Sequence, residues 1–243
     1  MKFFPLLCIF IHFMFIYNNK DETCENIIQK KNYLKKVKTI SLTYNYKING
    51  FSITNTQALI LIGLLETFKP NNICEFGAGE STKIFETYSK KYNKKFLNIE
   101  QNIDYIYKSS IYFPIKHNAS LVYDGISYEK NGIYDGLEEF FKNLKSKFDF
   151  VFIDGPYIDI KKYEYEYNRI QMIDFIEYDL LDDKGFFLVH DTARRADHRS
   201  INVLLLLFRK KYKLKIDYSN KGLPKELTII KFKKRKQIQL KKG

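Results

Sequence analysis

A glycine-rich stretch in the first third of the sequence combines residue types that bind cofactors. It spans residues 71–82 and reads NNICEFGAGEST. Its acid, its glycines and its hydroxyl side chains are Glu75, Gly77, Gly79, Ser81 and Thr82. The apolar run before the glycines predicts a short strand, and the run after them predicts a helix. A glycine turn between a strand and a helix N-terminus directs backbone N–H groups toward a ligand, so we expect a ligand here.

Acidic residues also follow the other strand-like runs of the central part of the chain. They are Glu100, Asp124, Asp154 and the acid within the His190-Asp191-Thr192 run. The carboxyl ends of parallel strands meet at one edge of a sheet, which is where ligands bind in such folds. Glu100 follows Gly77 by about 20 residues, the separation at which an acid meets the hydroxyls of a ribose. The sequence therefore predicts a cofactor that contains a nucleoside.

Strand-like and helix-like runs alternate along the chain. The expected strands are residues 73–76, 96–100, 119–123, 148–154, 185–190, 213–218 and 227–232. The expected helices are residues 54–68, 83–92, 104–111, 136–145, 164–181 and 200–212. This alternation predicts an α/β fold: a doubly wound, mostly parallel seven-stranded sheet with helices on both faces. No helix separates the last two strands, so we expect a C-terminal hairpin that places one antiparallel strand in the sheet.

Two residues distinguish between the cofactors that the glycine turn could hold. A dinucleotide-binding turn has a small residue where the helix meets the strand, and this chain has Thr82 there. The negative charge of Glu75, just before the turn, also disfavours a pyrophosphate and suits a cationic group such as an amine or a sulfonium. An NAD(P)-dependent oxidoreductase is therefore the alternative interpretation, and a cofactor-binding scaffold without catalysis is a second one.

Several motifs, taken together, resemble the class I S-adenosylmethionine-dependent methyltransferases. They are EFGAGEST from Glu75 to Thr82, Glu100, FDFVFIDGP at residues 148–156 and LVHDT at residues 188–192. The similarity covers residues 54–232 and keeps the order of the motifs. It implies a Rossmann-like domain that transfers a methyl group, most simply to the oxygen of a small molecule or of a sugar or glycan, with nitrogen as another acceptor.

The resemblance also implies roles for individual residues. Gly77 and Gly79 would approach the cofactor, Glu75 would lie near its methionine end, and Glu100 would hold the ribose hydroxyls. Asp124 is the candidate for the adenine. The two hydroxyl residues that follow the turn, Ser81 and Thr82, would either bind the carboxylate of the cofactor or cap the helix.

A magnesium site is a further implication of the resemblance. In the catechol-type O-methyltransferases, an acid after the fourth strand and an acid–amide pair after the fifth hold a divalent magnesium. Asp154 and Asp191 stand at the two acid positions, but Thr192 stands where the amide would be. Oxygen ligands and waters can hold Mg²⁺, so these three residues are candidate ligands. Without a metal, a base must take the proton of the acceptor, and Asp154, His190 and Asp191 are the candidate catalytic residues.

Composition restricts the class of protein. A chain of 243 residues with 45% hydrophobic residues can form one substantial domain and is not a disordered chain. Its net charge of +13 arises from 41 Lys and Arg residues that are spread along the sequence, so it does not indicate a nucleic-acid partner. The three cysteines show neither metal spacing nor a paired framework, which indicates a reducing, cytoplasmic location. The sequence shows no signal for an oligomeric state.

Both ends of the chain differ from the domain. Residues 1–20 contain an apolar run, residues 3–17, which would form about 22 Å of helix against a hydrocarbon core of about 30 Å. We expect either a short membrane anchor, with the domain on the cytoplasmic side, or a segment that packs on the domain or is removed from it. A cleaved export signal is the third interpretation. Residues 21–53 form a polar lead-in, and residues 233–243 form a basic tail.

Overall fold

The computed structural model describes residues 53, 55–116, 119–123, 126–130, 133–156, 169–219 and 227–234. The helices are α4 (Asn55–Phe68), α5 (Glu80–Tyr92), α6 (Leu137–Asn143), α7 (Gln171–Glu177) and α8 (Arg195–Phe208), with a 3-10 turn, η1 (Ile103–Tyr105). The strands are β1 (Asn72–Phe76), β2 (Lys95–Glu100), β3 (Ser110–Tyr112), β4 (Ile115–Lys116), β5 (Ala119–Tyr123), β6 (Ile126–Lys130), β7 (Ile133–Tyr134), β8 (Phe148–Ile153), β9 (Leu181–His190), β10 (Tyr212–Ser219) and β11 (Leu227–Lys234).

Among the described residues, seven strands form one sheet in the order β10-β11-β9-β8-β1-β2-β3. The strands from β9 to β3 in this order are parallel to their neighbours, whereas β11 is antiparallel to both β9 and β10. The predicted doubly wound sheet, with one antiparallel strand from a C-terminal hairpin, is therefore confirmed. Because β1, β2, β8 and β9 share one direction, the residues that follow them lie at the same edge of the sheet.

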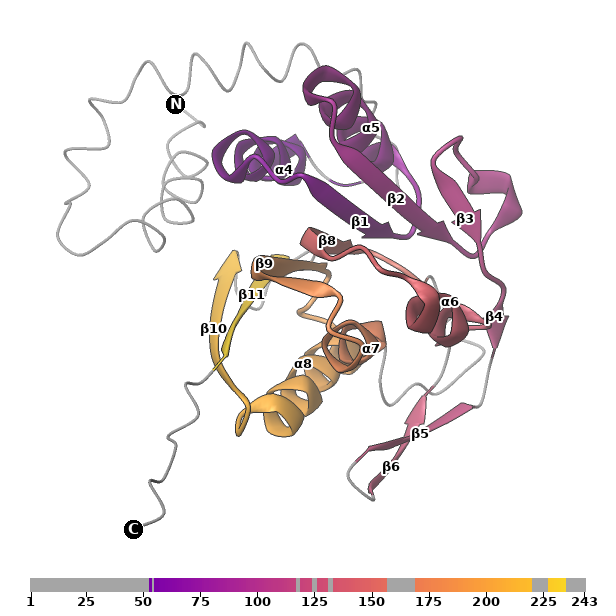
Figure 1. Cartoon of the computed structure of the whole chain (residues 1–243), viewed down its shortest axis with the longest axis vertical. Helices are drawn as coiled ribbons and strands as arrows, with labels where there is room; N and C mark the ends of the chain where they lie inside the picture. The colour runs from indigo at the N-terminus through magenta and orange to yellow at the C-terminus, as the bar shows by residue number, and fades with distance from the viewer. Residues whose placement is uncertain are drawn as a thin grey trace, which may run out of the picture.

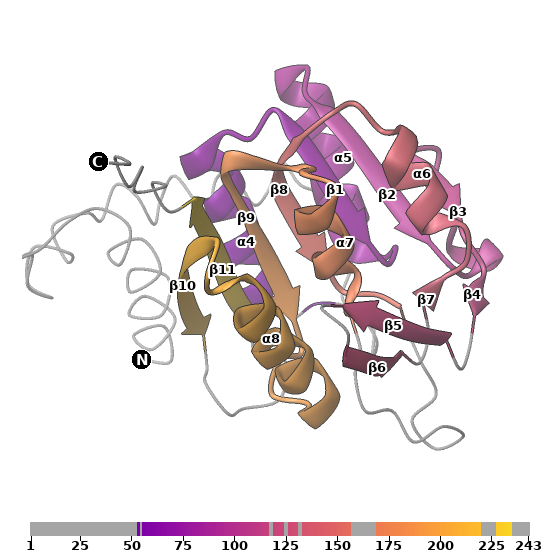
Figure 2. The same cartoon turned by 60° about the horizontal axis from the view of Figure 1, so that its bottom comes forward.

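Helices cover both faces of this sheet. The helices α4 and α5 lie on one face, and α6, α7 and α8 lie on the other (Figures 1 and 2). Successive side chains of a strand point to opposite faces, and the buried residues of β8 divide in this way. Phe150 and Phe152 pack in the core beneath α4 and α5. Val151 and Ile153 pack in the core beneath α6, α7 and α8.

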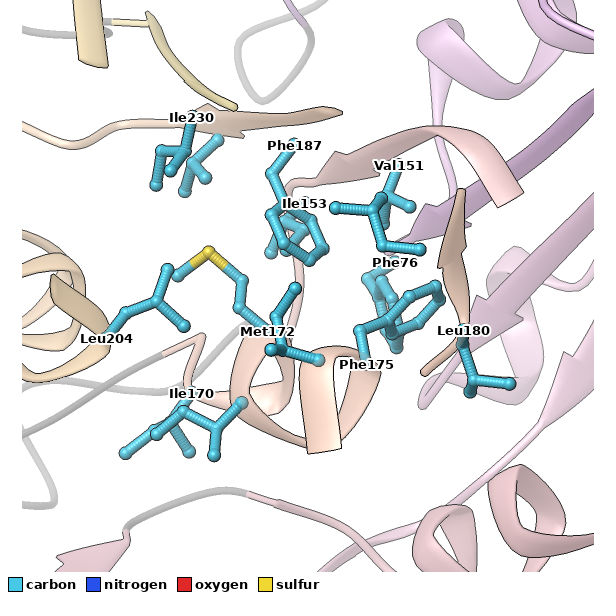
Figure 3. Packing of buried hydrophobic residues seen from close by; sticks show 14 of the residues in the cluster. Phe76, Val151, Ile153, Ile170, Met172, Phe175, Leu180, Phe187, Leu204 and Ile230 are labelled. Atoms are coloured by element: carbon cyan, nitrogen blue, oxygen red, sulfur yellow. The ribbon is translucent and has the colours of Figure 1, made fainter. Parts of the chain in front are cut away.

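The core on the side of α7 combines aliphatic side chains with aromatic rings such as those of Phe76, Phe175 and Phe187 (Figure 3). The ring of Phe76, the last residue of β1, lies 5.7 Å from that of Phe175 and 6.2 Å from that of Phe141, measured between ring centroids. Burial of each such side chain contributes roughly 1.5–3 kcal/mol. These contacts therefore fix the direction in which β1 leaves the core and enters the glycine turn.

The third strand of the sheet is not the predicted one. The sheet ends at β3, which pairs with β2. The predicted strand at residues 119–123 does form, as β5, but it pairs with β6 in a separate two-stranded sheet. Asp124, which was expected at the end of the third strand, lies outside the described residues.

The predicted helix at residues 104–111 was wrong. The side chain of Asn102 accepts the N–H of Asp104 at 3.0 Å, but this cap supports only η1. The hydroxyl of Ser110 then donates to the side chain of Asn98 in β2, which holds the segment in an extended conformation as β3. The segment therefore pairs with β2 as a strand instead of forming the predicted helix.

Other helix and strand ends also differ from the predicted ones. Within the described part of the predicted helix 164–181, only α7 (Gln171–Glu177) is α-helical, and Leu181 already belongs to β9. Residues 157–168 lie outside the described residues. The strand β9 is longer than the predicted 185–190. Helix α8 starts and ends several residues before the predicted 200–212, since Asp197 of its first turn pairs with a buried arginine.

The ends of the chain lie largely outside the described residues. Within the described ranges, none of the helices has the length and apolar character needed to cross a membrane. The apolar run at residues 3–17 falls outside those ranges, as does most of the lead-in at residues 21–53. The predicted anchor therefore stays a prediction. In the tail, β11 extends to Lys234, and residues 235–243 are not described.

Candidate active site

The first glycine of the turn is fixed by its backbone and by its neighbours. Gly77 has a φ of 88°, in the left-handed region that residues with a Cβ atom rarely adopt. A Cβ atom at this position would lie 2.9 Å from the backbone nitrogen of Gly155, in the loop after β8. The N–H of Gly77 donates to the carbonyl of Ile99 in β2 at 2.8 Å. Only glycine therefore fits where the ends of three neighbouring strands meet.

The second glycine faces open space. Gly79 has extended backbone, with a φ of 174°, and a Cβ atom there would meet no described atom within 4 Å. Its N–H donates to the hydroxyl of Thr82 at 2.9 Å, and the N–H of Ala78 donates to the carboxylate of Glu100. The amides of the turn are thus bonded within the protein. The turn offers a ligand room beside Gly79 rather than free N–H groups at these positions.

The carboxylate of Glu100 lies beside the turn, at the end of β2. It accepts the N–H groups of Gln101 and Asn102 at 2.7 Å on one oxygen, and the N–H of Ala78 on the other. Burial raises the pKa of Glu100 above its usual value, and these three N–H donors act against that shift. A carboxylate has about four lone-pair sites, so these contacts leave room for one hydroxyl donor on the second oxygen. Glu100 is therefore placed to accept a hydroxyl of a ligand beside the turn.

Glu75 lies beneath the turn and is fully buried. One oxygen accepts the hydroxyl of Ser81 at 2.6 Å, and the other accepts the amide of Asn98 at 3.0 Å. Burial raises the pKa of Glu75 well above its usual value, opposed by the bonds from Ser81 and Thr82. Glu75 thus joins β1, β2 and the first turn of α5. The hydroxyl of Thr82 accepts the N–H of Gly79, which favours the helix-capping interpretation for Thr82. The hydroxyl of Ser81 instead joins α5 to the carboxylate of Glu75 in β1.

The predicted catalytic residues converge at the ends of β8 and β9. The Nδ1 atom of His190 lies 2.6 Å from Oδ1 of Asp154 and 3.3 Å from Oδ2 of Asp191. The potential ligand atoms of these three residues all lie within 4.8 Å of one another. Asp154 is the most accessible of the three, with 24% of its side chain exposed, against 4% for His190 and 9% for Asp191. A substrate would therefore meet Asp154 first.

A buried arginine that the motifs did not indicate completes this cluster. The side chain of Arg169 is 3% exposed and lies between the two strand ends. Its Nη2 atom is 3.3 Å from Oδ1 of Asp154 and 3.9 Å from Oδ2 of Asp191, and its Nε atom is 3.2 Å from Oδ1 of Asp197. On the exposed side, Arg194 contacts Oδ2 of Asp191 at 2.6 Å. Acids and cations thus alternate through the site.

This alternation sets the charges of the site. Burial would lower the pKa of His190, but Asp154 and Asp191 raise it to about 9, so the imidazole is protonated at neutral pH. Burial acts to raise the pKa of Asp191, but the bond from His190 and the charges of Arg169 and Arg194 hold it well below its usual range. Burial raises the pKa of Asp197, with Arg169 opposing. The raised pKa favours a cationic His190 beside Asp154.

Thr192, the third candidate magnesium ligand, lies in a different environment. It is fully buried, and its hydroxyl is 2.6 Å from the hydroxyl of Thr228 in β11. This bond joins the residue after β9 to the neighbouring antiparallel strand. The hydroxyl of Thr192, a candidate magnesium ligand, therefore already has a hydrogen-bond partner in β11.

Comparison with known proteins identifies the fold. No protein-family model matches this sequence, and no curated protein sequence matches it. Among solved structures, the SAH-bound methyltransferase PaMTH1 from Podospora anserina is similar over 89% of this chain and 99% of its own, with 12% identity and a TM-score of 0.51. This chain therefore shares the fold of that methyltransferase. Cofactor-bound Rv0187 from MTB is also similar, over 84% of this chain and 91% of its own, with 11% identity and a TM-score of 0.50.

Proposed function

We propose that this protein transfers a methyl group from S-adenosylmethionine to an oxygen atom of a small molecule or of a sugar or glycan. The observation that carries the proposal is the open space beside Gly79, with the carboxylate of Glu100 next to the same turn. The fold supports it, because the similar structure of PaMTH1 is a methyltransferase bound to SAH, S-adenosylhomocysteine.

The residues around the turn fit such a cofactor. Glu100 has a lone-pair site for a ribose hydroxyl, and Gly79 leaves room for the cofactor to approach the backbone. Glu75 supports the turn from below, through Ser81 and Asn98. When bound, S-adenosylmethionine supplies a methyl carbon made electrophilic by a sulfonium. Holding this carbon in line with the acceptor accounts for much of the expected rate gain, because orientation replaces a bimolecular encounter.

Asp154 is the residue that we assign to the acceptor. It adjoins the turn, since a Cβ atom on Gly77 would lie 3.1 Å from the carbonyl carbon of Asp154. Its carboxylate would take the proton of the acceptor hydroxyl as that oxygen is methylated, and S-adenosylhomocysteine would be the leaving group. His190, on the other side, holds Asp154 in place and balances its charge. A positioned base of this kind contributes about 10²- to 10⁴-fold in rate.

Calorimetric titration of the purified chain with S-adenosylhomocysteine and with NADH tests the cofactor. We expect S-adenosylhomocysteine to bind and NADH not to bind. Glu100→Gln should weaken binding by about 10- to 100-fold, because a hydrogen bond to a charged group is worth about 1.5–3 kcal/mol. Glu138→Gln is the matched control, since Glu138 is an exposed acid that pairs with Lys142 on α6. Binding of NADH alone would show that the oxidoreductase interpretation holds instead.

The acceptor is found by incubating the chain with methyl-labelled cofactor and fractions of a cell extract. Label in a small-molecule or glycan fraction supports O-methylation. Cofactor binding without label in any fraction favours the non-catalytic scaffold. Fractionation of cells that express the chain with and without residues 1–20 tests the cytoplasmic location and the predicted membrane anchor.

A further inference from the structure

The guanidinium of Arg169 joins the ends of the two strands that hold the candidate catalytic residues. Nη1 donates to the carbonyl of Ile153 at 3.2 Å and to the carbonyl of His190, and Nη2 donates to the carbonyl of Asp154 at 3.2 Å. Ile153 ends β8, and His190 ends β9. Arg169 is thus enclosed by backbone acceptors of both strands, and its charge does not face solvent.

The same guanidinium contacts the carboxylate oxygens that a metal ion would need. Nη2 lies 3.3 Å from Oδ1 of Asp154 and 3.9 Å from Oδ2 of Asp191. The Nδ1 atom of His190 contacts the same two oxygens, at 2.6 Å and 3.3 Å. Cationic or hydrogen-bonding groups of the protein therefore already lie against both of the oxygens that face each other across the two strand ends.

Magnesium does not fit this arrangement. Mg²⁺ requires a nearly regular octahedron of oxygen ligands at about 2.0–2.1 Å. Nitrogen atoms of His190 and Arg169 already lie within 3.3 Å of Oδ1 of Asp154. Nitrogen atoms of His190 and Arg194 lie within 3.3 Å of Oδ2 of Asp191. The hydroxyl of Thr192 is bonded to that of Thr228. The charge is also already compensated, because Arg169 and Arg194 both contact Asp191. A divalent cation would have to displace buried protein cations.

We propose that Arg169 takes the place of the divalent cation in this site and is the positioning residue that holds Asp154 and Asp191 at the ends of β8 and β9. That this site needs no metal follows from the contacts of its carboxylates and of Thr192, whatever reaction the protein catalyses. The importance of Arg169 for methyl transfer rests on the proposed function, in which Asp154 takes the proton of the acceptor.

Binding of Mn²⁺ to the purified 243-residue chain, followed by electron paramagnetic resonance, tests the first part. The wild-type chain should bind no stoichiometric Mn²⁺ at this site. Arg169→Met keeps most of the side-chain volume but removes the charge, so Asp154, Asp191 and Asp197 would become available. We expect Arg169→Met to bind Mn²⁺ at least about 10-fold more tightly than the wild type and to gain thermal stability when Mn²⁺ is added.

Arg194→Met is the matched control. Arg194 contacts the same carboxylate of Asp191, but 56% of its side chain is exposed and it does not lie between the strand ends. Its loss should leave Mn²⁺ affinity within about 3-fold of the wild-type value. Stoichiometric Mn²⁺ binding by the wild-type chain that Asp191→Asn abolishes would overturn the proposal, and this measurement decides the question even if Arg169→Met does not fold. Equal Mn²⁺ affinity of folded Arg169→Met and Arg194→Met would overturn it as well.

Methyl transfer supplies the second readout. The rate of the wild-type chain should be unchanged by EDTA, and Arg169→Lys should retain more of the turnover number than Arg169→Met, with similar affinity for S-adenosylhomocysteine in both variants. A rate that EDTA abolishes and Mg²⁺ restores would contradict the proposal. A chain that transfers no methyl group at all would refute the proposed function, whereas the Mn²⁺ measurements would still decide the role of Arg169.

Discussion

The Nδ1 atom of His190 lies 2.6 Å from Oδ1 of Asp154, and this contact joins the last residue of β9 to the first residue after β8. The two strands are parallel neighbours, with Ile153 paired to Val189. The next residue on each strand is therefore brought to the same edge of the sheet. The pairing of the two strands therefore places the imidazole of His190 against the carboxylate of Asp154.

The contact makes stability depend on pH. The pKa of His190 is about 9 in the folded chain and near 6.5 when unfolded, which corresponds to a stabilisation of roughly 3 kcal/mol. Because the folded pKa is the higher one, this stabilisation is fully present below pH 6.5 and is lost as the pH rises through 9. Urea unfolding of the wild type and of His190→Gln between pH 6 and pH 10 should show a difference in the free energy of unfolding that shrinks with increasing pH.

His198→Gln is the control for this experiment, since His198 is exposed on α8 and its ring contacts only Asn202 among the hydrogen bonds described for it. Its effect should be small at every pH. A difference between the wild type and His190→Gln that stays constant from pH 6 to pH 10 would show that the imidazole is not held as a cation. The pKa of Asp191 is lowered by His190 and also by Arg169 and Arg194, so the part that His190 causes is not counted again.

Asp154→Asn should separate catalysis from cofactor binding. The amide cannot take a proton from an acceptor hydroxyl, so we expect the turnover number to fall by about 10²- to 10⁴-fold while the affinity for S-adenosylhomocysteine changes little. Asp149→Asn is the matched control on the same strand. Asp149 accepts the N–H groups of Asn71 and Asn72 at the other end of β8, so its loss should affect stability and not turnover. Equal turnover of the two variants would exclude Asp154 as the base.

The sequence predicts those parts of the site that depend on strand direction. Glu75, Glu100, Asp154 and Asp191 each stand in or just after an apolar run, and parallel strands bring such residues to one edge whatever the details of packing. The glycine turn was predictable because its glycines stand between an apolar, strand-like run and a helix-like run. What could not be predicted was the use of its amides, because their acceptors, such as Glu100 and Ile99, are distant in sequence.

Arg169 shows where sequence reasoning ends. It stands alone before a short helix, with no spacing that connects it to Asp154, Asp191 or Asp197. Its position between β8 and β9 arises from tertiary packing. The only indication in the sequence is an excess of acids at the strand ends, which requires compensating charge from some part of the chain. The edge strand β3 was missed for a related reason, since a bond from Ser110 to the neighbouring strand outweighed local helix preference.

Gly77→Ala should destabilise the fold. The left-handed backbone of Gly77 would cost a residue with a Cβ atom about 1–3 kcal/mol, and the contact of 2.9 Å with the backbone of Gly155 adds to this cost. The added Cβ atom would meet the backbone of Gly155, and the backbone at the end of a strand cannot shift without disturbing the sheet. Urea unfolding of Gly77→Ala should show a lower free energy of unfolding than the wild type. An unchanged value would mean that the turn adopts another conformation in solution.

Gly79→Val should leave the stability of the fold unchanged but weaken cofactor binding. The backbone at Gly79 is extended, as any residue can adopt, and the space around its Cβ position is open, so the free energy of unfolding should stay within about 0.5 kcal/mol of the wild type. If that space holds the cofactor, the added side chain will collide with it. Titration should then show S-adenosylhomocysteine binding weakened by at least about 10-fold, a loss of 1.4 kcal/mol. A stable Gly79→Val chain with wild-type affinity would place the cofactor elsewhere, because the valine would occupy space that the ligand does not use.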